Sequence, residues 1–105
     1  MATINLTSTA ATQILNENPK RTRLRIQMLP FDVDAGNTGR IHVGFGFQPI
    51  AVVGHVAQGE VLLQGAAIDE PPVSGKLSPD RKRIIWATSS QNNQSINVEE
   101  ETDNG

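Results

Sequence analysis

Apolar residues occupy every second position in several short stretches of the chain. In the segment 22–28, leucine, isoleucine and methionine alternate with arginine and glutamine. The segment 40–47 repeats this pattern with isoleucine, valine and phenylalanine, and the segment 95–99 repeats it near the C-terminus. Because successive side chains of a β-strand point to opposite faces, each stretch predicts a strand with one buried and one solvated face.

The alternation also predicts which side chains form the core. In the segment 40–47, Phe45 and Phe47 fall on the apolar face with Ile41 and Val43, whereas His42 falls on the solvated face. Trp86 stands between Ile85 and Ala87 and is predicted to be a core residue.

Other segments complete the predicted set of elements. Ile4 and Leu6 indicate an edge strand, and the denser apolar runs 60–64 and 83–88 predict strands that are covered on both faces. The segment 8–16 could form two helical turns, but its threonines favour an extended conformation. The segment 66–77 contains Pro71, Pro72 and Gly75 and is predicted to be an irregular surface loop. Turn signals lie between these runs, at 18–19, 35–37, 58–59, 78–80 and 92–93.

Short strands separated by frequent turns are typical of an all-β fold. We therefore expect residues 1–105 to form a single domain, a β-sandwich or small β-barrel of about six to eight short strands. The chain has no cysteine, so no disulfide can support this small core. Association with copies of itself or with a larger surface would provide that support.

Charge is distributed unevenly along the chain. The net charge of −2 gives no general attraction for nucleic acid or acidic membranes, and no apolar run is long enough for a membrane helix. Arg21, Arg23 and Arg25 form a basic cluster, whereas residues 99–105 are predicted to be a flexible acidic tail. The basic cluster could pair with the tail of another copy, or both could simply be solvated.

The residues that catalysis or metal binding would require are scarce. Cysteine and tyrosine are absent, the only histidines are His42 and His55, and no Gly-x-Ser-x-Gly motif occurs. The segment 32–37 resembles the start of a calcium loop, but it lacks the later acidic ligands, and a polar turn is the better interpretation. The glycines around Phe45 lie within a strand pattern and have no following Lys-Ser or Lys-Thr, unlike a phosphate loop. We therefore expect no enzymatic activity, no catalytic or metal-ligating residues and no cofactor.

The segment 13–27 carries a more specific pattern. From Ile14 onward it reads Ile-Leu-x-x-Asn-Pro-x-Arg-x-x-Leu-x-Ile-Gln. This order of residues is expected for the end of one strand, a tight turn and a second strand. This pattern resembles one found in small structural proteins of tailed bacteriophages, in which a Val-x-Phe-Gly-like strand, a strand that ends in a run of small residues and a final Val-x-x-Glu strand follow. The segments 41–46, 84–89 and 96–99 occupy the corresponding places. After Gln27 the sequence departs from the usual Asn-x-Gly and continues into a longer loop.

The resemblance implies a virion accessory protein, made in the host cytoplasm, that binds and stabilises a capsid or tail. Its expected partners are the major capsid protein or another virion protein and copies of itself, with a trimer as the first expectation. The weakly charged tract around Val52 and Val53 is predicted to lie at an interface, together with Arg21, Arg23 and Arg25. The alternative is a ligand- or carbohydrate-binding β-module of a tail or fibre.

Overall fold

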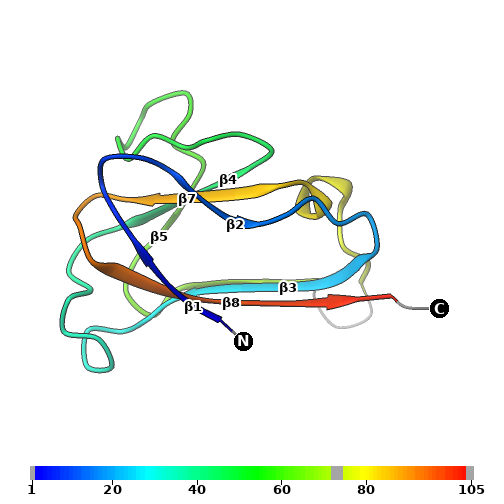
Figure 1. The fold of residues 1–105 in the computed structure, drawn as a ribbon, viewed down its shortest axis with the longest axis horizontal. Helices are drawn as coiled ribbons and strands as arrows, with labels where there is room; N and C mark the ends of the chain where they lie inside the picture. The colour runs from blue at the N-terminus through cyan, green and yellow to red at the C-terminus, as the bar shows by residue number, and fades with distance from the viewer. Residues whose placement is uncertain (1, 72–74, 104–105) are drawn as a thin grey trace.

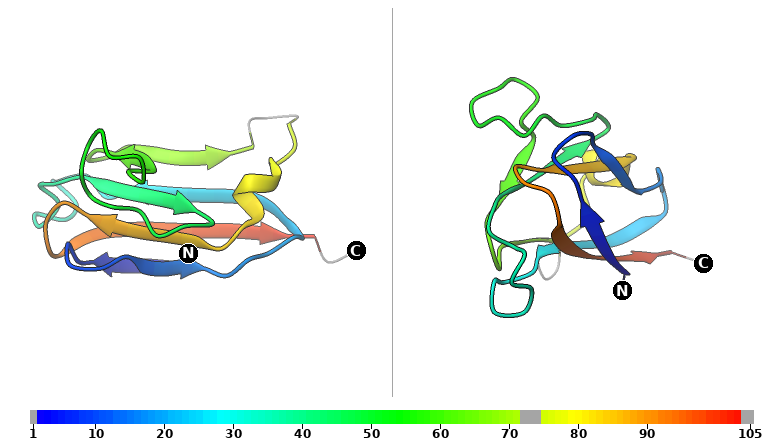
Figure 2. Two further views of the ribbon diagram at one scale, coloured as in Figure 1. Left: turned by 90° about the horizontal axis from the view of Figure 1, so that it is seen from above. Right: turned by 60° about the vertical axis from the view of Figure 1, so that its left-hand side comes forward.

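Two antiparallel sheets of four strands each pack face to face as a β-sandwich. The computed structural model describes residues 2–71 and 75–103. Sheet A has the strand order β1 (Ala2–Leu6), β8 (Gln94–Thr102), β3 (Arg21–Met28) and β6 (Ala67–Glu70). Sheet B has the order β2 (Thr12–Leu15), β7 (Ile85–Ser89), β4 (Ile41–Phe45) and β5 (Glu60–Leu62). One short 3-10 helix, η1 (Pro79–Lys82), precedes β7. Figure 1 shows the two sheets as upper and lower layers, and Figure 2 shows them from two other sides. The predicted all-β fold is confirmed.

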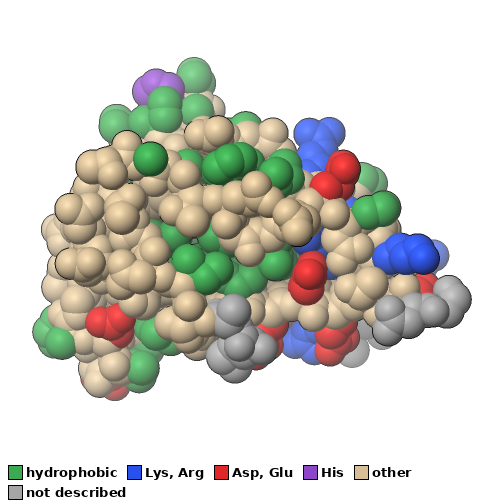
Figure 3. Space-filling view, viewed as in Figure 1, with side chains coloured by type: hydrophobic (Ala, Val, Ile, Leu, Met, Phe, Trp, Pro, Cys, Tyr) green, Lys and Arg blue, Asp and Glu red, His purple; other side chains and the backbone are tan. Residues whose placement is uncertain are grey.

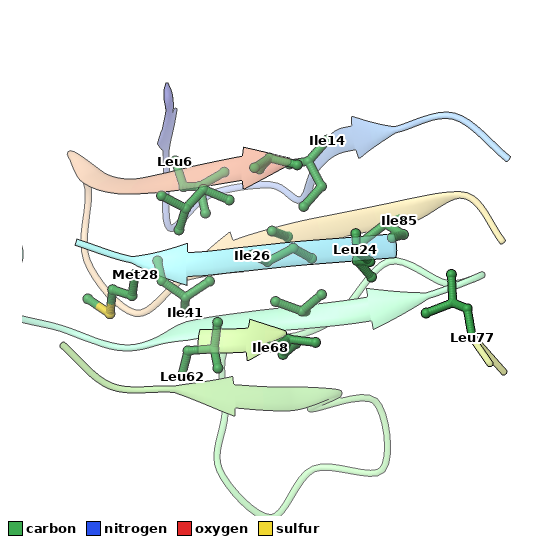
Figure 4. Close-up of a cluster of buried hydrophobic side chains, with 14 residues drawn as sticks. Leu6, Ile14, Leu24, Ile26, Met28, Ile41, Leu62, Ile68, Leu77 and Ile85 are labelled. Carbon is green, nitrogen blue, oxygen red and sulfur yellow. The ribbon is translucent and has the colours of Figure 1, made fainter. Parts of the chain in front are cut away.

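The core lies between the two sheets, as the alternation predicts. Leu24, Ile26 and Met28 of β3 are fully buried in one cluster with Ile41 and Val43 of β4. Figure 4 shows Ile26, Met28 and Ile41 within this cluster. Burial of each such side chain stabilises the fold by roughly 1.5–3 kcal/mol. The turn that precedes β3 forms as predicted, because the Asn18 side chain accepts a hydrogen bond from the Lys20 amide at 3.1 Å.

The first strand joins the two layers. β1 is an edge strand of sheet A, as predicted, and its pairing with β8 runs from Leu6↔Gln94 to Ala2↔Val98. The chain then crosses to sheet B, where β2 pairs with β7. The segment 8–16 is therefore extended over Thr12–Leu15 and contains no helix.

The prediction of an irregular loop over 66–77 is wrong for its first part. Ala67–Glu70 forms β6, which pairs with β3 through Ile26↔Ile68. Ile68 points into the core, and a strand with a single deeply buried residue leaves little periodic signal in the sequence. Residues 72–74 lie outside the described part of the chain.

The acidic tail is also different from the prediction. β8 continues to Thr102 and pairs with β3 as far as Arg21↔Thr102, and the Asp103 amide donates to the Lys20 carbonyl at 2.8 Å. Residues 99–103 are therefore part of sheet A or directly bonded to it, and residues 104–105 lie outside the described part. The acidic run continues β8 because its backbone pairs with β3 and Glu100 accepts a hydrogen bond from the buried Arg21.

Three further predictions of burial are corrected. Glu60–Leu62 is an edge strand, and its Val61 side chain is exposed, so β5 is not covered on both faces. Phe47 lies beyond the end of β4 and is 41% exposed. Trp86 is half-buried and does not belong to the core, because it alternates with the inward-facing Ile85 and Ala87.

Candidate docking site

A long loop between β4 and β5, residues 46–59, projects from the outer face of sheet B. We call it the apolar loop, since its exposed large side chains are Phe47, Ile50, Val52, Val53 and Val56. Val53 is 63% exposed and Val56 is 99% exposed. The right view of Figure 2 shows part of this loop, in green, projecting beyond the sheets, and hydrophobic side chains gather at its tip in Figure 3. Contiguous exposed apolar surface of this kind is characteristic of interaction sites.

The apolar loop has a defined internal structure. The Ile50 amide donates to the Ala57 carbonyl at 2.9 Å, which closes the base of the tip. Within the tip, the His55 amide donates to the Val52 carbonyl, and the Gly54 amide donates to the Gln58 side chain at 2.8 Å. These bonds hold the valines in one arrangement, so a partner would not have to order them on binding.

Two glycines allow the apolar loop to pack closely on β4. A Cβ atom on Gly44 would lie 2.3 Å from the Phe47 carbonyl oxygen, and one on Gly59 would lie 2.2 Å from the Val43 carbonyl oxygen. Gly59 also has a φ of +67°, which side chains other than glycine rarely adopt. Pro49 is buried against this face of β4. Gly44 in the strand and Gly59 in the loop thus allow the two backbone segments to approach closely.

His42 is buried beneath the apolar loop, and the prediction that it is solvated is wrong. Its Nδ1 donates to the Gln58 carbonyl at 2.9 Å, while its Nε2 accepts from Arg40 Nε at 3.3 Å. Arg40 also donates to the Ala51 carbonyl at 3.4 Å. Burial lowers the pKa of His42 below its usual value. The outward face of β4 is buried because the loop folds back over it, which the alternation alone could not reveal.

Both histidines make hydrogen bonds to backbone or guanidinium groups. His42 contacts a backbone carbonyl and a guanidinium, and His55 Nδ1 accepts from the Ala57 amide at 3.0 Å. A histidine that acts as a base toward a serine or threonine needs a hydroxyl within hydrogen-bond reach. In the ranges 2–71 and 75–103, neither imidazole has such a hydrogen bond, and no three His, Asp or Glu side chains come together as metal ligands. The segment 32–37 forms a turn in which Asp34 accepts from the Gly36 amide.

The predicted interface residues do not lie together. Val52 and Val53 are exposed at the tip of the apolar loop, beside sheet B. Arg23 and Arg25 lie in β3 of sheet A, and their side chains pair with Asp69 of β6 at 3.2 and 3.5 Å. The basic and apolar parts of the prediction therefore belong to different sheets.

Arg21 does not belong to the basic face at all. Its side chain is completely buried at the end of the sandwich, so it cannot take part in an interface as predicted. Its Nε donates to Glu100 Oε2 at 2.7 Å, and its terminal nitrogens donate to the carbonyls of Asn16, Arg81 and Arg83. A bulge in β3 between Arg21 and Arg23 breaks the alternation and turns this side chain inward.

Among the exposed apolar side chains of the loop, Phe47 is the one that the alternation wrongly places in the core. The local signal for the correct placement is the sequence Gly46-Phe47-Gln48-Pro49, because glycine and proline together end a strand.

No family model, curated protein or solved structure matches the chain. In the described part of the chain, no helix is long and apolar enough to cross a membrane.

Proposed function

We propose that the chain is a structural accessory protein of a tailed-phage particle, and that it attaches to the capsid or tail through the apolar loop. The ordered, exposed tip of this loop is the observation that carries the proposal. Phe47, Ile50 and the three valines would be buried on attachment, and at about 25 cal/mol per Å² their burial would provide most of the binding free energy.

The resemblance of the segment 13–27 to phage structural proteins supports a phage particle as the partner. This segment comprises most of β2, the turn after it and most of β3, so the resemblance is independent of the apolar loop. Many weak attachments become effective when the surface is a symmetric particle that presents the same site repeatedly. A loop whose conformation is already set is suited to such a role.

A paired substitution tests the attachment. Val53→Asp places a charge in the tip, whereas Val33→Asp places the same charge on a valine that is 68% exposed in the loop between β3 and β4. We expect Val53→Asp to lower binding to particles that lack the protein by about tenfold or more, and Val33→Asp to leave it unchanged. Co-sedimentation with these particles measures the binding.

Mass spectrometry of particles from the phage that encodes the chain tests the assignment itself. We expect many copies per particle. The absence of the protein from purified particles, or equal effects of the two aspartates, would contradict the proposal.

The alternative of a carbohydrate-binding module rests on a different feature. A polar hollow of about 520 Å³ is lined by Thr38, Arg40, Gln64, Ser90 and Gln91 together with Gly39 and Leu63. No aromatic ring lines this hollow, although rings commonly stack on sugars, and for that reason we favour attachment to a particle. Glycan binding that is lost in Gln91→Ala and kept in Val53→Asp would favour the alternative.

A further inference from the structure

One side of β8 is left open over four of its nine residues, 99–102. The described part of β1 begins at Ala2, opposite Val98, and pairs with β8 from there to Leu6↔Gln94. β8 continues through 99–102 with β3 on one side. In the described ranges no strand pairs with the other side of this stretch. Four residues of strand correspond to an edge about 13 Å long. Such an edge can pair with an extended segment of another chain.

A groove lies beside this open edge, between the two sheets. It has a volume of about 480 Å³, and its lining comes from β1, β2 and β8. Ile4, Ile14, Leu15 and Val98 provide the apolar part, and Ile4 and Leu15 are only half-buried. Figure 3 shows hydrophobic side chains in the hollow between the upper and lower layers. If another strand paired with β8 here, every second side chain of that strand would point into the groove and cover these apolar side chains.

Glutamates border the same groove and differ in what they contact. Glu100 is held by Arg21 at 2.7 Å. Glu99 and Glu101 lie opposite Arg25 and Arg23 in the sheet register, but both arginines pair with Asp69 instead. Across the described residues, no basic side chain lies within 4.0 Å of the Glu99 or Glu101 carboxylates. Two carboxylates next to the open edge therefore keep their capacity to bind cations.

We propose that an extended segment of a partner protein, with alternating apolar and basic residues, adds to β8 at Glu99–Thr102 as an extra strand. Its apolar side chains would fill the groove over Leu15, and its lysines or arginines would lie beside Glu99 and Glu101. A second copy of β8 is a poor occupant, because glutamates would then meet glutamates. The acidic edge thus opposes self-pairing and selects a basic strand. This inference does not depend on the apolar loop.

Binding of a designed peptide to the intact protein tests the site. The probe is the peptide Lys-Val-Lys-Val-Lys-Val-Lys, and amide chemical shifts of the labelled protein report where it binds. We expect shift changes at 12–15 and 98–102, weaker binding at high salt, and no binding of the Glu-Val counterpart. Shift changes confined to other segments, or none at all, would overturn the proposal.

Two controls separate strand addition from simple charge attraction. Glu101→Lys should weaken peptide binding about tenfold. Asp32→Lys, which makes the same change of charge at an exposed site in the loop between β3 and β4, should not weaken it. Methylation of alternate peptide nitrogens blocks the hydrogen bonds of one peptide edge. Two peptides are compared, one methylated at the odd-numbered nitrogens and one at the even-numbered nitrogens. Only one of them should fail to bind, because only one edge of the peptide faces β8.

The same experiments define the contrary outcomes. Equal binding of both methylated peptides would mean that charge alone attracts the probe and would overturn strand addition. A wild-type dimer that Glu101→Lys abolishes, measured by sedimentation, would identify a second copy as the occupant and overturn the proposed partner. Loss of particle attachment in Val53→Asp with peptide binding intact would leave this inference standing, and the reverse result would leave the proposed function standing.

Discussion

Single residues at the ends of the sandwich show how polar side chains stabilise this fold. Arg21 closes one end, where its guanidinium satisfies three carbonyls and the Glu100 carboxylate. A buried charge is tolerated only when its hydrogen bonds are complete. Asn37 is buried in a similar way, and its side chain bridges the Leu29 and Ser95 carbonyls and accepts from the Ser95 amide at 2.7 Å. Both residues connect segments that are distant in the sequence.

The complete hydrogen bonding of Arg21 predicts a large effect of a conservative substitution. Lysine cannot reach all four acceptors with one ammonium group, so we expect Arg21→Lys to lower the free energy of unfolding by about 3 kcal/mol. Arg23→Lys is the control, because its half-exposed pair with Asp69 is worth at most about 1 kcal/mol. Urea denaturation of the two variants measures the difference, and equal midpoints would contradict the structural role of Arg21.

His42 predicts a pH dependence of stability. Its pKa is lowered in the folded state, mainly by burial, so the unfolded chain binds more protons at mildly acidic pH. Its contribution to stability is therefore complete above the ordinary histidine pKa of about 6.5 and is lost progressively as the pH falls through that value. Asp34, whose pKa is lowered by hydrogen bonding with the Ser95 side chain and the Gly36 amide, acts in the same direction but only below the ordinary aspartate pKa of about 3.9.

Urea denaturation between pH 5 and 8 measures this dependence, which follows from the titration of histidine. We expect the unfolding free energy of the wild type to rise with pH across this range. The rise should be smaller in His42→Gln and preserved in His55→Gln, since His55 is exposed. An unchanged slope in His42→Gln would mean that another group causes the dependence.

At the scale of elements, the apolar loop and β4 form one unit. The loop buries the outward face of β4, and Gly44 and Gly59 allow the two backbones to approach. The pairing of β8 with β3 forms a second unit, in which an acidic and a basic strand lie side by side. On the outer face of sheet A the charge pairs join β3 to β6, where Arg23 and Arg25 meet Asp69, and such cross-strand pairs contribute roughly 0.2–1 kcal/mol each.

A pair of glycine substitutions tests the contact between the loop and β4. Gly54 and Gly59 both have positive φ, but a Cβ on Gly54 meets no atom within 4 Å, whereas one on Gly59 meets the Val43 carbonyl. Gly54→Ala should therefore cost only the backbone strain of about 1 kcal/mol. Gly59→Ala should cost clearly more and shift the amide resonances around His42. Similar unfolding free energies for the two variants would contradict the close approach.

On the scale of the whole molecule, the sandwich presents three different surfaces. The outer face of sheet A carries paired charges, the apolar loop projects from sheet B, and the open edge of β8 lies along the groove between the sheets. The core of a chain this small is limited, so burial of the apolar loop in an assembly would add stability.

Self-association through the apolar loop is the prediction at this scale. We expect the wild type to form oligomers, a trimer first, at high micromolar concentration, and Val53→Asp to remain monomeric because a charge would be buried at the interface. Sedimentation equilibrium of both proteins measures this, with Val33→Asp as the matched control. A wild-type monomer that still binds particles would remove self-association and leave the attachment in place.

The sequence by itself determined the all-β class, most strands, the turn at Asn18-Pro19 and the apolar character of the tract around Val52 and Val53. These features are local, because the alternation of a strand and the chemistry of a turn are set by neighbouring residues. Only the tertiary structure decided that His42 is buried, that Arg21 turns inward and that the acidic run pairs with β3. Each of these depends on a segment far away in the sequence: the loop that covers a strand, the bulge that shifts the register with β8, or the strand that pairs with an acidic run. The open edge of β8 is of the same kind, since it depends on how the distant strand β1 pairs with β8, and that pairing reaches only Ala2↔Val98.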